Sequence, residues 1–430
     1  MKAKNNFFWL LAAFFIMFHA CSEGERFSVT DKNSPAPNPP TFLGYEPLPG
    51  GVRIFFDIPD NVDLLSIDAE HTTEAGKKLW FSVSFYVDSL DVFGFVEEKP
   101  HNIRLYATNR AGNRSTPVEL TVTPMESALP KIYENIDVKG AVRSLLVDWE
   151  NEMQQPINVF VDFSFRMQGQ TRSLTRVFTS NQLVERRPIY DMNIAEGEMV
   201  DVSLRIEDLY GNTTSAKSMG QIPLLFDQEL DKSLWSFPPA GFVMGGSTMV
   251  NANIDEGRIA FLNDGLINDG EEVNYILTPP INPWNVFIDL GRKVELTRII
   301  TWQRRFGAAL GTDMDGVEGF DPNERRFDRG ILYDIMNVGR YRMWRWDDET
   351  ERWEELSVHR IPIPLGMTDI DVIRMHNERG DEAYIHPEDP RFSKPTRWFR
   401  YQALNGFTNN HGSTNANSLA EISLFGRYVD

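Results

Sequence analysis

The chain has 430 residues, which is too long for one ordinary domain and predicts roughly two to four. Hydrophobic residues make up 41% of it and aromatic residues 12%, which indicates buried cores rather than a disordered chain. The net charge of −19 disfavours nucleic acid as a partner and electrostatic docking on anionic lipid, because there is no surplus of cationic side chains.

The N-terminus has the pattern of an export signal. Lys2 and Lys4 precede an apolar run, residues 7–18, that is shorter than the roughly 20 residues of a membrane span. Residues 1–20 are therefore predicted to be a signal peptide. The only cysteine, Cys21, follows directly, and its position resembles the lipobox of bacterial lipoproteins, in which the signal is cut before a cysteine that receives a diacylglycerol. The alternative is a cleaved signal with an incidental thiol.

A tether is predicted after the cysteine. The acidic stretch at residues 22–25 resembles the export signal that sends some Gram-negative lipoproteins to the outer cell surface. Residues 31–40 are rich in proline and poor in apolar residues, which is typical of an extended, semi-rigid segment. Residues 21–40 are thus expected to form a lipid-anchored tether on the outer membrane, exposed at the cell surface.

Short strands separated by turns are predicted from residue 41 onward. In GVRIFFDIP, for example, Val52, Ile54 and Phe56 share one face, which is the period of a strand with one side on a core. Phe56-x-x-Pro59 stands where fibronectin type III domains have W-x-x-P, and LYATNRAGNRSTP resembles their late strand and turn. This resemblance implies a fibronectin type III-like domain at residues 41–125.

The same plan returns about 100 residues later, which is the length of one immunoglobulin-like sandwich. IRLYATNRAGNRST reappears as VSLRIEDLYGNTTS, with Gly112-Asn113 replaced by Gly211-Asn212. Residues 126–224 are therefore expected to be a second immunoglobulin-like sandwich. Both turns contain N-x-S/T, but Gly-Asn in a tight turn that needs positive φ explains them better than glycosylation does.

Residues 225–430 hold seven of the ten tryptophans and resemble the discoidin, or coagulation-factor type C, domain. The resemblance implies a jelly-roll β-sandwich of the galactose-binding-like class, so the predicted fold class is all-β, two immunoglobulin/fibronectin type III-like sandwiches followed by this jelly roll. The resemblance rests on six pieces in order: an Asp-Gly turn at Asp264-Gly265, W-x-x-x-x-D-L-G from Trp284 to Gly291, a strand ending in a basic loop, a strand–acidic turn–Trp unit from Tyr341 to Trp353, an aromatic-Arg strand at 398–400, and a closing E-I-x-L-F-G.

The whole arrangement resembles accessory lipoproteins of glycan-uptake loci, which implies a cell-surface protein that binds a polysaccharide or oligosaccharide through its C-terminal domain. Two alternatives remain. One is an assembly subunit that binds an outer-membrane transporter or another surface lipoprotein. The other, a carbohydrate-active hydrolase, has less support, because the sequence contains no H-E-x-x-H, G-x-S-x-G, P-loop or dinucleotide fingerprint. We therefore expect a non-enzymatic protein without catalytic residues.

Aromatic and arginine side chains are the candidate glycan contacts, because aromatic rings pack on the C–H faces of sugars and arginine bonds their hydroxyls. Trp302 ends a predicted strand, and Arg304 and Arg305 follow it at the start of a long insertion. Trp344 and Trp346 share one face of another strand, and that face is either core or an exposed platform. The alternative for the arginines is pairing with acids of the insertion.

A structural calcium is implied by the discoidin resemblance, in which the ion often sits beside the Asp-Gly turn. The corresponding residues are Asp264 and Glu421, with Asp269 as a further ligand. Hard carboxylate oxygens suit calcium. The competing interpretation pairs Glu421 with an arginine, such as Arg400 or Arg427, or has it point to solvent. No other cofactor is expected.

Overall fold

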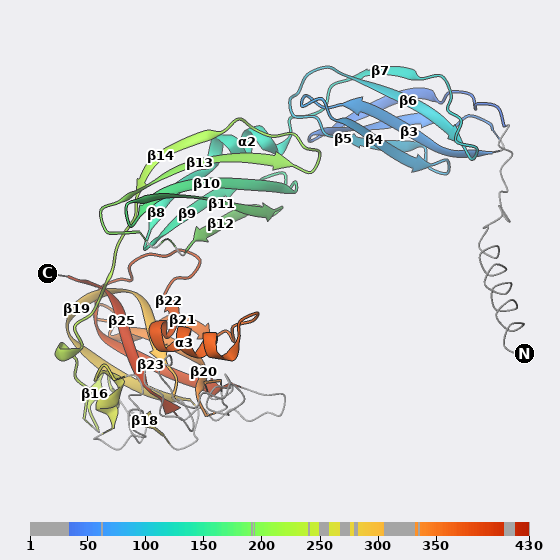
Figure 1. Cartoon of the computed structure of the whole chain (residues 1–430). Helices are drawn as coiled ribbons and strands as arrows, with labels where there is room; N and C mark the ends of the chain where they lie inside the picture. Colours follow the sequence, from blue (N-terminus) through green and yellow to red (C-terminus); the bar gives the residue numbers. More distant parts are fainter. Residues whose placement is uncertain are drawn as a thin grey trace, which may run out of the picture.

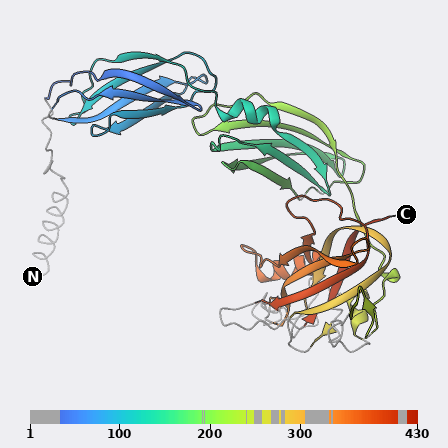
Figure 2. The same ribbon diagram turned by 180° about the vertical axis from the view of Figure 1, so that it is seen from behind.

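A computed structural model gives the fold. It describes residues 34–429, except for single positions at 62, 191, 193 and 240 and the ranges 249–257, 267–275, 279–282, 305–331, 334–335 and 408–417. The predicted signal peptide, Cys21 and the tether up to residue 33 lie outside the described residues. Figures 1 and 2 show three β-sandwiches that follow one another along a bent row. The predicted fold class, all-β with two fibronectin type III-like sandwiches and a discoidin-like jelly roll, is confirmed.

The first sandwich packs two antiparallel sheets, with strand orders β1-β2-β5 and β4-β3-β6-β7. Val52, Ile54 and Phe56 lie in its core, as the alternation of the sequence predicts. The strands are β1 (Thr41–Leu48), β2 (Gly51–Asp57), β3 (Leu64–Thr72), β4 (Lys78–Ser84), β5 (Ser89–Phe93), β6 (His101–Asn109) and β7 (Val118–Val122).

The second sandwich has sheets of order β11-β10-β13-β14 and β12-β9-β8, and a short helix packs on its core. Gly112 and Gly211, the glycines of the repeated turns, both have positive φ, of 83° and 87°, which confirms the tight-turn interpretation. The elements are α2 (Ala128–Asn135), β8 (Asp137–Ala141), β9 (Ser144–Glu150), β10 (Ile157–Met167), β11 (Gln170–Ser180), β12 (Val184–Ile189), β13 (Met199–Asp208) and β14 (Lys217–Pro223).

The C-terminal sandwich is built on a sheet of order β15-β25-β19-β23-β20-β21, and β22 pairs with β19. The elements are β15 (Gln228–Glu229), η1 (Lys232–Leu234), β16 (Val243–Met244), β17 (Ser247–Thr248), η2 (Ile259–Leu262), β18 (Ile276–Leu277), β19 (Trp284–Trp302), β20 (Val338–Asp347), β21 (Arg352–Arg360), α3 (Asp369–Arg379), β22 (Asp381–Tyr384), β23 (Thr396–Gly406), β24 (Ser418–Leu419) and β25 (Glu421–Tyr428). Neither α2 nor α3, nor any other helix among the described residues, is long and apolar enough to cross a membrane.

Specific contacts hold each sandwich to the next. Between the first and second, the Asn212 side-chain amide donates to the Gly94 carbonyl over 3.0 Å, and the Gln155 amide donates to the Pro49 carbonyl over 2.7 Å. Between the second and third, the rings of Tyr190 and Tyr384 lie 4.6 Å apart. The two joints therefore have defined geometry rather than a free linker.

Candidate functional site

The outer face of the C-terminal sheet carries a cluster of aromatic, arginine and amide side chains. Side chains alternate along each strand, so Tyr341 and Met343 of β20 enter the core while Trp344 lies on the outer face. The strand register then places Arg400 of β23 between Trp344 and Phe287 of β19. We call the outer-face cluster the Trp344 patch; it consists of Asn285, Arg342, Trp344, Glu355, Arg400 and Gln402.

Two guanidinium groups flank the Trp344 ring. The guanidinium carbon of Arg400 lies 5.1 Å from the ring centroid, and that of Arg342 lies 5.4 Å from it. Both distances allow cation–π attraction. The three side chains are half-buried, so part of each surface stays open to solvent.

The two arginines of the patch differ in their partners. Arg342 pairs with Glu355, with 2.9 Å between Nε and Oε2. Arg400 Nε donates to Asn285 Oδ1 over 2.9 Å, an oxygen that Gln402 also bonds. Among the residues that the structure describes, no carboxylate lies in ion-pair reach of Arg400. Burial, and then the charge of Arg342, lower the pKa of Arg400.

The predicted glycan contacts fall in different places. Trp302 is 8% exposed at the end of β19, where it pairs with the first residue of β25 rather than with β23 or β20. Arg304 follows it and is half-buried, whereas Arg305 lies outside the described residues. Trp346 is 7% exposed, and Trp353 covers it with 5.6 Å between the ring centroids. Of the three tryptophans, Trp344 alone is left half-buried.

Sequence reasoning missed Arg342, Arg400 and Asn285 as site residues. The period of two in YRMWRW did place Arg342 and Trp344 on one face, but it could not show which face is core, because both carry large apolar groups. Arg400 reaches Trp344 only through the pairing of β20 with β23, which local sequence does not specify.

A second cluster surrounds Glu421, whose side chain is buried at the start of β25. Its Oε1 accepts from the ammonium group of Lys232 in η1, and its Oε2 has no hydrogen-bond partner among the described residues. Burial raises the pKa of Glu421 to about 7; Lys232 opposes this rise, and the charge of Asp264 adds to it. The partner of Glu421 is thus a lysine and not an arginine.

The predicted arginine partners of Glu421 bond elsewhere. Arg400 donates to Asn285, and Arg427 Nε lies 2.6 Å from Glu295 Oε2. The charge of Asp264 acts on Glu421, but within the described parts of the chain no three His, Cys, Asp or Glu side chains are grouped to hold a metal. Asp269 lies outside the described residues. Calcium therefore stays a prediction.

Comparisons with known proteins find similarity over part of the chain or in the fold. Residues 37–124 match a family described as a domain of unknown function, DUF4959. No curated protein matches the sequence. A SusE-like protein of known structure is 16% identical, with a TM-score of 0.37, over 69% of this chain and 98% of its own.

Two further solved structures resemble the chain at low identity. CBM32-3, from a family 31 glycoside hydrolase of Clostridium perfringens, is 16% identical over 46% of this chain and 95% of its own, with a TM-score of 0.27. A fucolectin from the serum of striped bass, Morone saxatilis, is 10% identical over 69% of this chain and 86% of its own, also with a TM-score of 0.27.

Proposed function

We propose that this protein is a glycan-binding accessory protein of the cell surface and that it holds carbohydrate on the Trp344 patch. One observation carries the proposal: a half-buried indole on the outer face of the sheet is flanked by two guanidinium groups. Aromatic rings pack on the C–H faces of sugars, and the half-buried guanidinium of Arg400 suits ring hydroxyls. The proposal assigns no catalytic residue.

We also propose that the protein is anchored at the cell surface by its N-terminus. Residues 1–20 act as a signal peptide, Cys21 carries the lipid, and residues 21–40 hold the first sandwich away from the outer membrane. The first two sandwiches then serve as spacers that present the C-terminal domain to glycan.

One observation favours the alternative, assembly with an outer-membrane transporter or another surface lipoprotein. Leu183, just before β12, and Val184, its first residue, are 50% and 63% exposed, and β12 is an edge strand of its sheet. Exposed apolar side chains beside an unpaired strand edge suit a protein partner.

Affinity electrophoresis of the full chain through gels that contain single polysaccharides tests the proposal. We expect a retarding polysaccharide to lose at least tenfold in affinity with Trp344→Ala, a change of about 1.4 kcal/mol. Trp80→Ala is the matched control, because Trp80 is 41% exposed under the guanidinium of Arg114 but belongs to the first sandwich. Equal retardation of both variants and the wild type would place the site elsewhere. No retardation in any polysaccharide, together with capture of a transporter that Val184→Asp abolishes, would favour assembly.

A further inference from the structure

Two further arginines extend the Trp344 patch along the sheet. Arg340 lies two residues before Arg342 on β20, so both lie on the outer face, and Arg360 of β21 is directly opposite Arg340 in the strand register. Arg340 and Arg360 are exposed. We call the row of Arg340, Arg342, Arg360 and Arg400 the arginine strip. From Arg340 to Trp344 it extends roughly 13 Å, at about 3.3 Å per strand residue.

The arginine strip has less acid around it than the rest of the molecule. Among the described residues, Glu355 alone pairs with a member of the strip, Arg342. No carboxylate in the described ranges lies in ion-pair reach of Arg340, Arg360 or Arg400. The whole chain, in contrast, has 62 acidic side chains and 43 lysines and arginines. Four cationic groups beside one carboxylate are therefore a local exception in an acidic protein.

Like charges lie close together within the arginine strip. Arg340 and Arg360 form a directly opposed cross-strand pair, and like charges in that position destabilise a sheet. Burial, and next to it the charge of Arg342, lower the pKa of Arg400, so these two guanidinium groups also repel one another. An anion bound between the arginines would reduce both repulsions.

Arg400 is positioned to hold such an anion. Its guanidinium carbon lies 5.4 Å from the Phe287 ring centroid and 5.1 Å from that of Trp344, and its Nε donates to Asn285. The two rings and the amide fix the orientation of the group, while Nη1 and Nη2 make no hydrogen bond to another described residue. A guanidinium fork matches two oxygens of one carboxylate or sulfate.

The negative charge of the whole protein does not prevent this contact. Salt screens exposed charges beyond about 8–10 Å at physiological ionic strength, so the nearest groups decide which ion binds.

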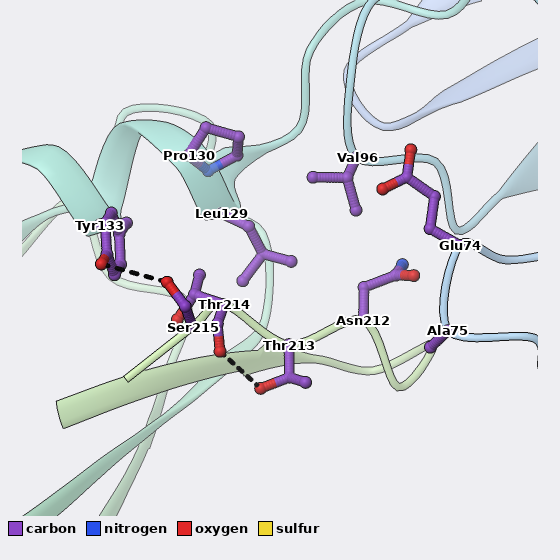
Figure 3. Close-up of a pocket in the computed structure, with 10 residues that line it drawn as sticks. All are labelled: Glu74, Ala75, Val96, Leu129, Pro130, Tyr133, Asn212, Thr213, Thr214 and Ser215. Atoms are coloured by element: carbon purple, nitrogen blue, oxygen red, sulfur yellow. Dashed lines mark hydrogen bonds between the residues drawn. The ribbon is translucent and has the colours of Figure 1, made fainter. Parts of the chain in front are cut away.

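The cavity of about 390 Å³ at the joint between the first and second sandwiches is a poorer place for an anion (Figure 3). The described residues that line it include no arginine or lysine, and Glu74 adds a carboxylate to its wall. The arginine strip is therefore the better candidate for an anionic ligand.

From these features we propose that the glycan on the Trp344 patch is acidic: a sugar ring packs on Trp344, and the arginine strip binds carboxylate or sulfate groups of the same chain. This inference rests on the glycan-binding function proposed above and names the class of glycan. Carboxylate and sulfate share the chemistry that the guanidinium groups recognise, so the experiment separates them.

The experiment is affinity electrophoresis and calorimetry of the full chain with matched pairs of polysaccharides. Polygalacturonate and alginate, each beside its methyl ester, form the carboxylate arm; dextran sulfate and carrageenan, each beside its unsulfated form, form the sulfate arm. We expect at least one acidic polysaccharide to bind, its neutral counterpart to bind at least tenfold more weakly, and the affinity to fall as sodium chloride is raised. Double-stranded DNA is the control polyanion and should not bind.

Two sets of variants test the arginines. Arg340→Gln combined with Arg360→Gln removes two exposed charges, and we expect it to weaken binding of the acidic polysaccharide roughly three- to tenfold. The matched control combines Arg172→Gln with Arg176→Gln, two exposed arginines of β11 in the second sandwich, and should leave binding unchanged although the net charge changes equally.

Arg400→Gln is expected to weaken acidic binding tenfold or more, because it removes a charge-assisted hydrogen bond. Its melting midpoint is measured first, since Arg400 is half-buried and bonded to Asn285. If this variant does not fold, the double variant at Arg340 and Arg360 decides alone.

The outcomes separate this inference from the proposed function. Neutral polysaccharides that bind as tightly as their acidic counterparts, in a manner that depends on Trp344, overturn the inference and keep the function. Acidic binding that the Arg340 and Arg360 double variant leaves unchanged, or equal binding of DNA, also overturns the inference. Acidic binding that the double variant weakens and Trp344→Ala does not keeps the arginine strip and removes the indole. No binding of any polysaccharide removes both.

Discussion

At the scale of single residues, Glu421 is subject to opposing influences. Its burial penalises the charged form and the nearby charge of Asp264 does so too, while the Lys232 ammonium favours the charged form. The net result is a pKa of about 7 against an ordinary value of 4.5. Because folding raises this pKa, proton binding at Glu421 is linked to stability.

We predict that Glu421 makes the free energy of unfolding fall as the pH rises from about 4.5 to about 7. In this window the folded state keeps a proton that the unfolded state has lost, so raising the pH favours unfolding; above it both states are ionised. The contribution is at most about 3.5 kcal/mol, at ~1.4 kcal/mol per pKa unit. Urea denaturation at pH 4.5, 6 and 8 should show this slope in the wild type and not in Glu421→Gln.

Glu295→Gln is the control for that series, because Glu295 pairs with Arg427 on the neighbouring strand and should keep the wild-type pH dependence. Identical slopes in all three proteins would contradict the prediction. The same proteins test calcium: if the ion binds Glu421, the melting midpoint of the wild type rises with calcium concentration and falls with chelator, and that of Glu421→Gln does neither.

At the scale of elements, β19 pairs with different strands along its length. Its first part pairs with β23, and its later part pairs with β25 and β22; a register shift in the pairing with β23 lies between Asp289 and Val294. Gly291 lies in this shift with φ of +75°. The irregularity redirects one long strand, so that the half bearing Phe287 supports the Trp344 patch and the other half supports Glu421.

Gly291→Ala is predicted to destabilise the C-terminal sandwich by roughly 2 kcal/mol or more, since an alanine Cβ would lie 2.6 Å from the Leu234 carbonyl oxygen and would also adopt a left-handed φ. Gly246→Ala separates the two causes: its φ is +74°, but no atom lies within 4 Å of the added Cβ. Chemical denaturation should show the smaller loss for Gly246→Ala. Equal losses would mean that the contact with Leu234 contributes nothing.

At the scale of the whole molecule, Asp227 joins the second sandwich to the third. Its buried carboxylate accepts from Arg143 at 2.5 Å, from Arg298 at 2.8 Å and from Thr297 at 2.6 Å. Although burial raises the pKa of Asp227, these bonds, led by Arg298, hold it below its ordinary value. Their contribution to stability is therefore present at neutral pH and is lost as the pH falls below about 4.

Asp227→Ala is expected to lower the free energy of unfolding by about 3–5 kcal/mol, because it leaves the buried Arg298 with one fewer counter-charge. Asp389→Ala is the matched variant at the same joint: it removes an exposed pair with Arg186, at 3.3 Å, and should cost less than about 1 kcal/mol. Calorimetry of thermal unfolding measures the loss of stability in both variants. A loss at Asp227 no larger than that at Asp389 would show that the joint does not depend on the buried carboxylate.

The sequence by itself determined the elements and the fold class. Strands such as GVRIFFD alternate apolar and polar residues because one side of a sheet faces a core, and that local rule requires no knowledge of partners. The repeated Gly-Asn turns were also readable, since positive φ favours glycine whatever surrounds it. On the same local basis the sequence placed Trp344 opposite Tyr341 and Met343 on β20.

Only the tertiary structure decided what those faces meet. Which side of β20 is core, and that Arg400 lies against Trp344, follow from the order of strands in the sheet. The partner of Glu421 is Lys232, which is 189 residues away and belongs to η1 rather than to a strand. Asn212 lies at the joint of two domains because the first sandwich packs on its turn. Each of these contacts joins segments that are distant along the chain, and local periodicity carries no information about which distant segments pack together.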